Sequence, residues 1–234
     1  MISGEGKMKQ YNIYPTLIDS YRLFLGTDYV SFAELIDRIN RVPHKPSEAA
    51  SKGMAFNSLI DSLLRGEAPP ALKVQKQQKT YDASDTFEIK NDGWVFHFDK
   101  SLATSLACRL AGAMPQVFLN SAIDTPAGLV NLYGYADYIL KDSVIDLKTT
   151  SSYTWPKFLN SFQHKAYMVC ARDMGYQINR AEYLVTDFNS FYVEDYLWKE
   201  SIRAEVVSEL IGFINFIWEH KKVINNAKLF GENT

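Results

Sequence analysis

The sequence predicts an α/β protein in which a mixed β-sheet is flanked by helices and preceded by a helical N-terminal extension. The chain has 234 residues, of which 47% are hydrophobic and 22% charged, a composition typical of a globular protein with a substantial core. Apolar residues recur at helical spacing near both ends of the chain, and strand-like alternation occurs between them. We therefore expect one domain over 1–234, with a helical part at 1–70, a sheet core at 86–197 and a C-terminal helix at 199–224.

The N-terminal part is predicted to contain three helices. Ser31 and Glu34 have the spacing of a capping box, and Pro43 should end the helix that they begin. The strongest pattern follows Ser47 and stops at Gly66. The three helices are expected at 16–25, 31–40 and 47–64.

A polar, aperiodic segment at 71–85 predicts a surface loop. Lys73, Lys76 and Lys79 make it the best local basic patch in the sequence. If the protein binds DNA, this loop is the first place to expect a flap that follows the phosphates.

The central part changes to the alternation expected of strands. Asn91-Asp92-Gly93 is a hairpin turn signal, and the short polar link at 141–143 predicts a second tight turn. Helical spacing returns between the later strands and after residue 199. Strands are expected at 86–90, 94–98, 116–122, 129–140, 144–149, 180–187 and 191–197, and helices at 101–112 and 155–173.

Composition excludes several classes of protein. Cys108 and Cys170 lie in apolar helical patterns, which predicts reduced core thiols, and two cysteines cannot hold an iron–sulfur cluster. No segment has the roughly 18 apolar residues of a membrane span, so we expect a cytoplasmic protein without a membrane partner. The net charge of −2 neither supports nor excludes DNA as a partner. Phosphate-binding glycine loops and paired histidine motifs are absent from the sequence.

One stretch of polar residues follows the strand pattern with a spacing suited to chemistry. Asp146 and Lys148 should lie on one face of their strand, about 6–7 Å apart, while Ile145 and Leu147 point to the opposite face. Asp137, on the neighbouring strand, can come alongside because the short turn fixes the register.

Two adjacent carboxylates repel each other, and a cation between them removes that cost. Oxygen ligands of this kind suit Mg²⁺ or Mn²⁺, which would activate water and stabilise charge on a phosphate. The simpler explanation is an ion pair of Asp146 with Lys148 on an edge strand, with Asp137 as a solvated strand end. Taken alone, an aspartate two residues before a lysine favours that explanation.

The complete pattern is more specific. The segments GYAD at 134–137, VIDLKTT at 144–150 and QHKAY at 163–167, in this order and spacing, resemble the PD-(D/E)XK nuclease superfamily. The resemblance is strongest to RecB-type nuclease domains and phage-type exonucleases. It implies a restriction-endonuclease-like fold and a DNA nuclease that depends on Mg²⁺ or Mn²⁺.

The resemblance also implies roles for individual residues. Asp137 and Asp146 would be metal ligands, with the Leu147 carbonyl as a further ligand, and Lys148 would be the catalytic lysine. Gln163 and Tyr167 lie one helical turn apart, so both could reach the DNA backbone or the active site. Without the preceding motif, a tyrosine that only covers the sheet would be the preferred explanation.

The sequence departs from the superfamily pattern at two positions. Relatives place a His or Glu on an N-terminal helix, often four residues after a glycine, and Asn57 follows Gly53 here. An Asn carbonyl can bind a hard cation, and Asp61 lies one turn later on the same face, so either residue could supply the missing ligand. Some relatives use a Glu on the strand before GYAD, where this chain has Gln116, a poorer ligand.

Three functions remain open at the level of sequence. The first is an exonuclease that acts on DNA ends in recombination, repair or phage replication. The second is a structure-selective or site-specific endonuclease, because one fold can host both activities. The third is a catalytically weakened DNA-binding protein, which only the changes at Asn57 and Gln116 support. A homo-oligomeric ring could provide processivity, although the sequence shows no closed interface.

Overall fold

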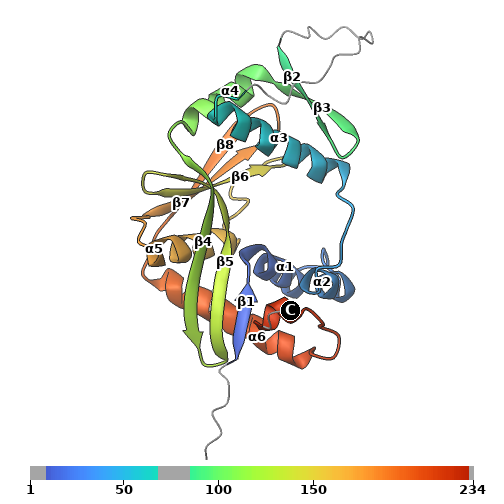
Figure 1. Ribbon diagram of the computed structural model, residues 1–234, viewed down its shortest axis with the longest axis vertical. Helices are drawn as coiled ribbons and strands as arrows, with labels where there is room; N and C mark the ends of the chain where they lie inside the picture. Colours follow the sequence, from blue (N-terminus) through green and yellow to red (C-terminus); the bar gives the residue numbers. More distant parts are fainter. Residues whose placement is uncertain (1–8, 68–84, 232–234) are drawn as a thin grey trace, which may run out of the picture.

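The computed structural model describes residues 9–67 and 85–231, and it has the predicted α/β architecture (Figure 1). A six-stranded mixed sheet is flanked by helices, and a separate two-stranded sheet lies beside the N-terminal helix α3. The predicted basic loop with Lys73, Lys76 and Lys79 lies outside the described residues. Among the described helices, none has both the length and the apolar character needed to span a membrane.

The three N-terminal helices begin and end close to the predicted positions. They are α1 (Pro15–Gly26), α2 (Phe32–Ile39) and α3 (Glu48–Leu64). The capping box is confirmed, because the Ser31 hydroxyl accepts from the Glu34 amide and the Glu34 carboxylate accepts from the Ser31 amide. The Ser47 hydroxyl caps α3 in the same way by accepting from the amide of Ala50.

Within the main sheet, strand β5 (Gly128–Leu140) has one irregular edge, and this edge positions the candidate site. The other strands of the sheet are β1 (Gln10–Ile13), β4 (Met114–Thr125), β6 (Ser143–Thr149), β7 (Arg180–Thr186) and β8 (Phe191–Leu197). Strand β4 pairs with β5 along its whole length, so β1 and β6 share the opposite edge of β5. Pairing with β1 ends at Leu132, and pairing with β6 involves Tyr138 to Leu140. Within the described parts of the chain, residues 133–137 therefore have no strand partner on that edge.

Strand β6 is internal, since it pairs antiparallel with β5 and parallel with β7. The parallel connection runs through α5 (Gln163–Asp173). The predicted helix at 155–173 is wrong in its first half, where turns and bends replace it. The carboxylate of Glu194 accepts from the backbone amides of Lys157 and Phe158, which holds that segment in a non-helical path.

The predicted hairpin is confirmed as β2 (Thr86–Asn91) and β3 (Trp94–Asp99), with Asp92 and Gly93 both at positive φ in the turn. It forms its own sheet rather than joining the main one. The aromatic residues of β3 are divided between the core and the surface. Phe96 and Phe98 are buried, whereas Trp94 is exposed.

Two hydrophobic clusters pack against the main sheet. The larger one joins the sheet to α1, α2, α5 and α6 (Ser201–Glu219), and it contains Cys170, the buried thiol that the sequence predicted. The smaller one joins the sheet to α3, β2, β3 and α4 (Lys100–Arg109). Cys108 is exposed, so its assignment to the core was wrong, because Ala103 and Leu106 form the buried face of α4.

Two short elements were not predicted. Strand β1 has four residues, too few to establish an alternation, and a 3-10 turn, η1 (Ala227–Phe230), packs beside it near the C-terminal end. Strand β1 lies at the lower end of β5 in Figure 1, away from α3 and α4, and η1 packs against it. Strand β1 pairs with the first part of this edge of β5, and the unpaired segment 133–137 follows it.

Candidate active site

The unpaired segment of β5 ends at Asp137. The side chain of Asp137 lies between β5 and β6, where the pairing of these two strands stops. The Asp137 Oδ2 atom accepts a hydrogen bond from the backbone amide of Leu147 at 2.8 Å. The carboxylate thus replaces a strand carbonyl at the point where regular β5–β6 pairing stops. Because the amide of Leu147 faces this gap, its carbonyl faces the same edge of β6.

Strand β5 also changes the direction of its side chains at Asp137. Residues two apart in a regular strand share a face, yet Ala136 packs in the larger cluster and Tyr138 in the smaller one. On β4, the register passes from Pro115 to Val117, and the intervening Gln116 has a left-handed φ of 50°. Gln116, the weaker alternative ligand, is exposed.

Asp146, Lys148 and Gln163 form a closed set of polar contacts on the face of the sheet covered by α5. Asp146 Oδ1 accepts from Gln163 Nε2 at 2.8 Å, and Lys148 Nζ donates to Gln163 Oε1 at 2.7 Å. Lys148 Nζ lies 2.7 Å from Asp146 Oδ2 as an ion pair, although this oxygen has no well-aligned hydrogen bond in the described structure. The predicted common orientation of the two side chains is confirmed, with Ile145 and Leu147 in the opposite cluster.

Lys148 keeps its proton in this setting. Burial by itself would lower the pKa of Lys148, but the carboxylates of Asp146 and Asp137 raise it above its usual value. The ammonium group is therefore charged at neutral pH. It can offset negative charge or orient a nucleophile, and it is not available to accept a proton.

Asp137 has the opposite problem, because its charged form is disfavoured. Burial raises the pKa of Asp137 to about 7, and the nearby carboxylates of Asp146 and Asp61 act in the same direction. The Leu147 amide and Lys148 only partly oppose this shift. The site thus gathers more negative charge than its own groups neutralise.

Helix α3 approaches the site from the opposite face and brings Asn57 and Asp61 with it. Asp61 Oδ1 accepts from the hydroxyl of Tyr138 at 2.6 Å. Asn57 Oδ1 is buried without a hydrogen-bond partner in the described parts of the chain. The close approach depends on Gly53, where an added Cβ would lie 2.6 Å from Thr149 Oγ1. Of the two helix candidates, Asn57 is the one with an oxygen left unsatisfied.

The donor set offers a hard cation two carboxylates rather than a larger cluster of acidic side chains. Within the described residues, no group of three or more His, Cys, Asp and Glu side chains is placed to hold a metal ion. Mg²⁺ commonly binds through one or two carboxylates and keeps several waters. Asp137 and Asp146 meet that requirement, and two buried oxygens, on Asp146 and Asn57, lack aligned donors. The residues present therefore fit a divalent cation bound mostly by oxygen ligands and water.

Gln163 and Tyr167 face the site together, as their spacing predicted. Gln163 Nε2 also contacts the Tyr167 hydroxyl at 3.2 Å, and that hydroxyl donates to the backbone carbonyl of Tyr135 at 2.7 Å. Both side chains are buried. Gly134 lets the ring approach, because a Cβ there would lie 3.0 Å from Tyr167 Cε1. Gln163 therefore positions Asp146 and Lys148, and Tyr167 fastens α5 to the unpaired edge of β5.

The sequence reasoning missed one residue that builds this arrangement, Asp19 on α1. Its carboxylate accepts from the amide of Phe162 and the hydroxyl of Ser161, directly before Gln163. Burial raises the pKa of Asp19. Asp19 thus caps the N-terminus of α5 from a helix more than a hundred residues earlier. An acidic residue within the apolar pattern of α1 was the only available signal.

Comparisons with known proteins do not identify a function. No family model matches the chain, and no curated protein matches it. A solved structure described as "Crystal structure of SSO0001" is similar, with 16% sequence identity and a TM-score of 0.44. The similarity covers 100% of this chain and 90% of that chain.

Proposed function

We propose that the protein is a metal-dependent DNA nuclease that hydrolyses phosphodiester bonds. The observation that carries the proposal is the meeting of Asp137, Asp146 and Lys148 at the gap between β5 and β6. These are the residues that the superfamily pattern assigns to metal binding and catalysis. We also propose that the protein acts on DNA in the cytoplasm.

In this proposal the metal is Mg²⁺ or Mn²⁺. Asp137, Asp146 and the Leu147 carbonyl would hold it, with the unsatisfied oxygen of Asn57 as a further ligand. When bound, such an ion lowers the pKa of a coordinated water and offsets charge on a phosphate oxygen. Asp61 holds the hydroxyl of Tyr138 and supports the strand from the α3 side.

Lys148 supplies a fixed positive charge beside the reacting phosphate. Its ammonium group is held between Asp146 and Gln163, and nearby carboxylates keep it protonated. A preorganised charge of this kind stabilises the negative charge that develops during hydrolysis. Gln163 contacts both of the other side chains, so it fixes their relative positions.

We favour an exonuclease that acts on DNA ends, in recombination, repair or phage replication. The motifs resemble those of RecB-type domains and phage-type exonucleases. Linear DNA should be degraded with Mg²⁺ or Mn²⁺, and covalently closed circles should persist. Nicking of the circles would instead identify an endonuclease, and loss of neither substrate would leave a DNA-binding protein.

The variant that tests the catalytic role is Lys148→Met. We expect cleavage of linear DNA to fall by about two orders of magnitude or more, while DNA binding is largely retained, because one charge at a phosphate typically contributes that much. Lys165→Met is the matched control, since it removes a lysine of α5 that pairs with Glu205 outside the site. Equal cleavage by the two variants would remove Lys148 from the mechanism.

A further inference from the structure

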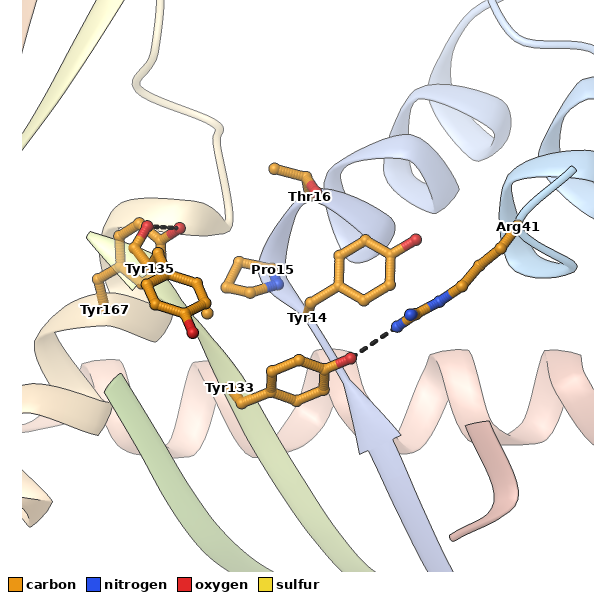
Figure 2. A pocket seen from close by; sticks show the side chains of 8 residues that line it. Tyr14, Pro15, Thr16, Arg41, Tyr133, Tyr135 and Tyr167 are labelled. Atoms are coloured by element: carbon orange, nitrogen blue, oxygen red, sulfur yellow. Dashed lines mark hydrogen bonds between the residues drawn. The ribbon is translucent and has the colours of Figure 1, made fainter. Parts of the chain in front are cut away.

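A pocket with a volume of about 470 Å³ opens beside the candidate active site. Figure 2 shows Arg41 reaching toward Tyr14 and Tyr133, with Tyr135 beyond Pro15 on the side of Tyr167. The walls come from the start of α1, the turn that follows α2, the middle of β5 and helix α5. They are formed by Tyr14, Pro15, Thr16, Arg41, the segment 133–135 and Tyr167.

The pocket and the carboxylates lie along the same unpaired edge of β5. Tyr135 precedes Asp137 by two residues, which corresponds to about 7 Å along a strand. Tyr167, in the pocket wall, contacts Gln163, and Gln163 contacts Asp146. A ligand in the pocket would therefore lie directly next to the proposed site of cleavage.

The lining combines aromatic faces with one positive charge. Arg41 donates to the Tyr133 hydroxyl at 2.6 Å, and its guanidinium carbon lies 5.2 Å from the centre of the Tyr14 ring. Tyr135 is 59% exposed, and its ring contacts the exposed ring of Phe118 at 5.2 Å between centroids. No acidic side chain is among the described residues that line the pocket. These features suit a flat ring attached to an anionic group.

We propose that this pocket binds one nucleotide of an unpaired DNA strand, with its base on Tyr135 and a backbone phosphate at Arg41. The volume lies in the range of about 300–1,000 Å³ that holds small-molecule ligands, so the pocket is large enough for one nucleotide. A base inside a duplex must first be unpaired and unstacked to reach such a pocket. The inference rests on the proposed function, and it names single-stranded or frayed ends as the substrate.

The test measures binding separately from cleavage. Fluorescence anisotropy in EDTA should show that a labelled oligothymidylate binds at least about tenfold more tightly than a blunt hairpin duplex. Tyr135→Leu should weaken binding of the single strand by about tenfold, the usual loss for one stacked base. Tyr29→Leu is the matched control, because Tyr29 is 86% exposed and does not line the pocket. Arg41→Gln should reduce the salt dependence of binding by about one phosphate contact.

Equal affinity for strand and duplex, or equal binding by the Tyr135 and Tyr29 variants, would overturn the inference. Thymidine monophosphate should compete only at far higher concentration than the oligomer. Competition at similar concentration would make a free nucleotide the ligand and overturn the assignment to a strand.

Failure of this inference can be told apart from failure of the nuclease proposal. The nuclease proposal predicts that Mn²⁺ raises the melting temperature of the wild type, because an ion that binds only the folded state stabilises it. Tyr135→Leu should retain this rise. If neither this rise nor cleavage occurs while Tyr135-dependent binding persists, the nuclease proposal fails and the pocket stands. If cleavage and the Mn²⁺ response persist while Tyr135→Leu binds the single strand as tightly as the wild type does, only the inference about the pocket fails.

Discussion

Asp137 is the residue whose role in the proposed chemistry costs the fold most, because a metal ligand must be charged and the surroundings of Asp137 disfavour its charged form. Its carboxylate is surrounded by Asp146 and Asp61 and is largely removed from water, so its pKa rises to about 7. Asp146, in contrast, has Lys148 and Gln163 as direct partners. Asp137 is therefore the better position for a test that needs no DNA.

The first test at Asp137 is the pH dependence of stability in metal-free buffer. The folded-state pKa lies above the usual aspartate value of 3.8, so the folded protein retains a proton that the unfolded chain has released. The contribution of Asp137 to stability is complete below pH 4 and is lost as the pH rises through about 7, at up to about 1.4 kcal/mol per pH unit. Thermal melting should show Asp137→Asn to be more stable than wild type at pH 8, with a smaller difference at pH 5.5.

The second test at Asp137 adds the metal. An ion that binds only the folded state at a hundredfold excess over its Kd contributes about 2.7 kcal/mol, so Mn²⁺ should raise the melting temperature of the wild type by a few degrees. Asp137→Asn should lose most of this rise, whereas Asp124→Asn, at an exposed position on β4, should keep it. If Asp137→Asn melts lower in EDTA and still responds to Mn²⁺, Asp137 has a structural role only.

Helix α3 is held against the end of β6 by a contact that only glycine permits. An added Cβ at Gly53 would meet Thr149 Oγ1 at 2.6 Å, while at Gly212 on α6 it would meet only the Tyr21 hydroxyl at 3.9 Å. Alanine normally stabilises a helix interior by about 1 kcal/mol relative to glycine. The two glycines therefore allow a matched comparison of propensity and steric fit.

We expect Gly212→Ala to raise the free energy of unfolding and Gly53→Ala to lower it, as measured by urea denaturation. Gly53→Ala should also reduce cleavage, because α3 carries Asn57 toward the site. Thr149→Ala should restore stability when it is combined with Gly53→Ala, since it removes the clashing oxygen. Stabilisation by both alanines would mean that α3 can move without cost.

The helices differ in whether neighbouring residues or distant ones fix the position at which they begin. Ser31 and Ser47 each lie directly before the helix that they cap, so the local sequence predicted both starts. The start of α5 depends on Asp19 from α1, and the loop before it depends on Glu194 from β8. A local pattern at 155–162 cannot contain this information, and the predicted helix was therefore too long.

At the scale of the whole molecule, the sequence predicted the fold class and the strands that carry the candidate site. The alternation in β6 predicted that Asp146 and Lys148 share a face, and the short turn predicted that Asp137 lies nearby. The unpaired edge could not be predicted, because it depends on β1 and β6 pairing with different halves of β5. The pocket beside it joins residues from α1, the turn after α2, β5 and α5 and follows from the same pairing.

The unpaired edge should also be visible in the rate at which backbone amides exchange with heavy water. Leu129 donates its amide to Lys9, on the β1 side, so alternation directs the amide of Tyr135 toward the same edge. The amides of Gly134 and Ala136 face β4 and its continuous ladder. Exchange followed by NMR should therefore be faster at Tyr135 than at either neighbour, in the centre of a sheet where slow exchange is the rule. Equal protection of all three amides would mean that this edge of β5 is closed in solution.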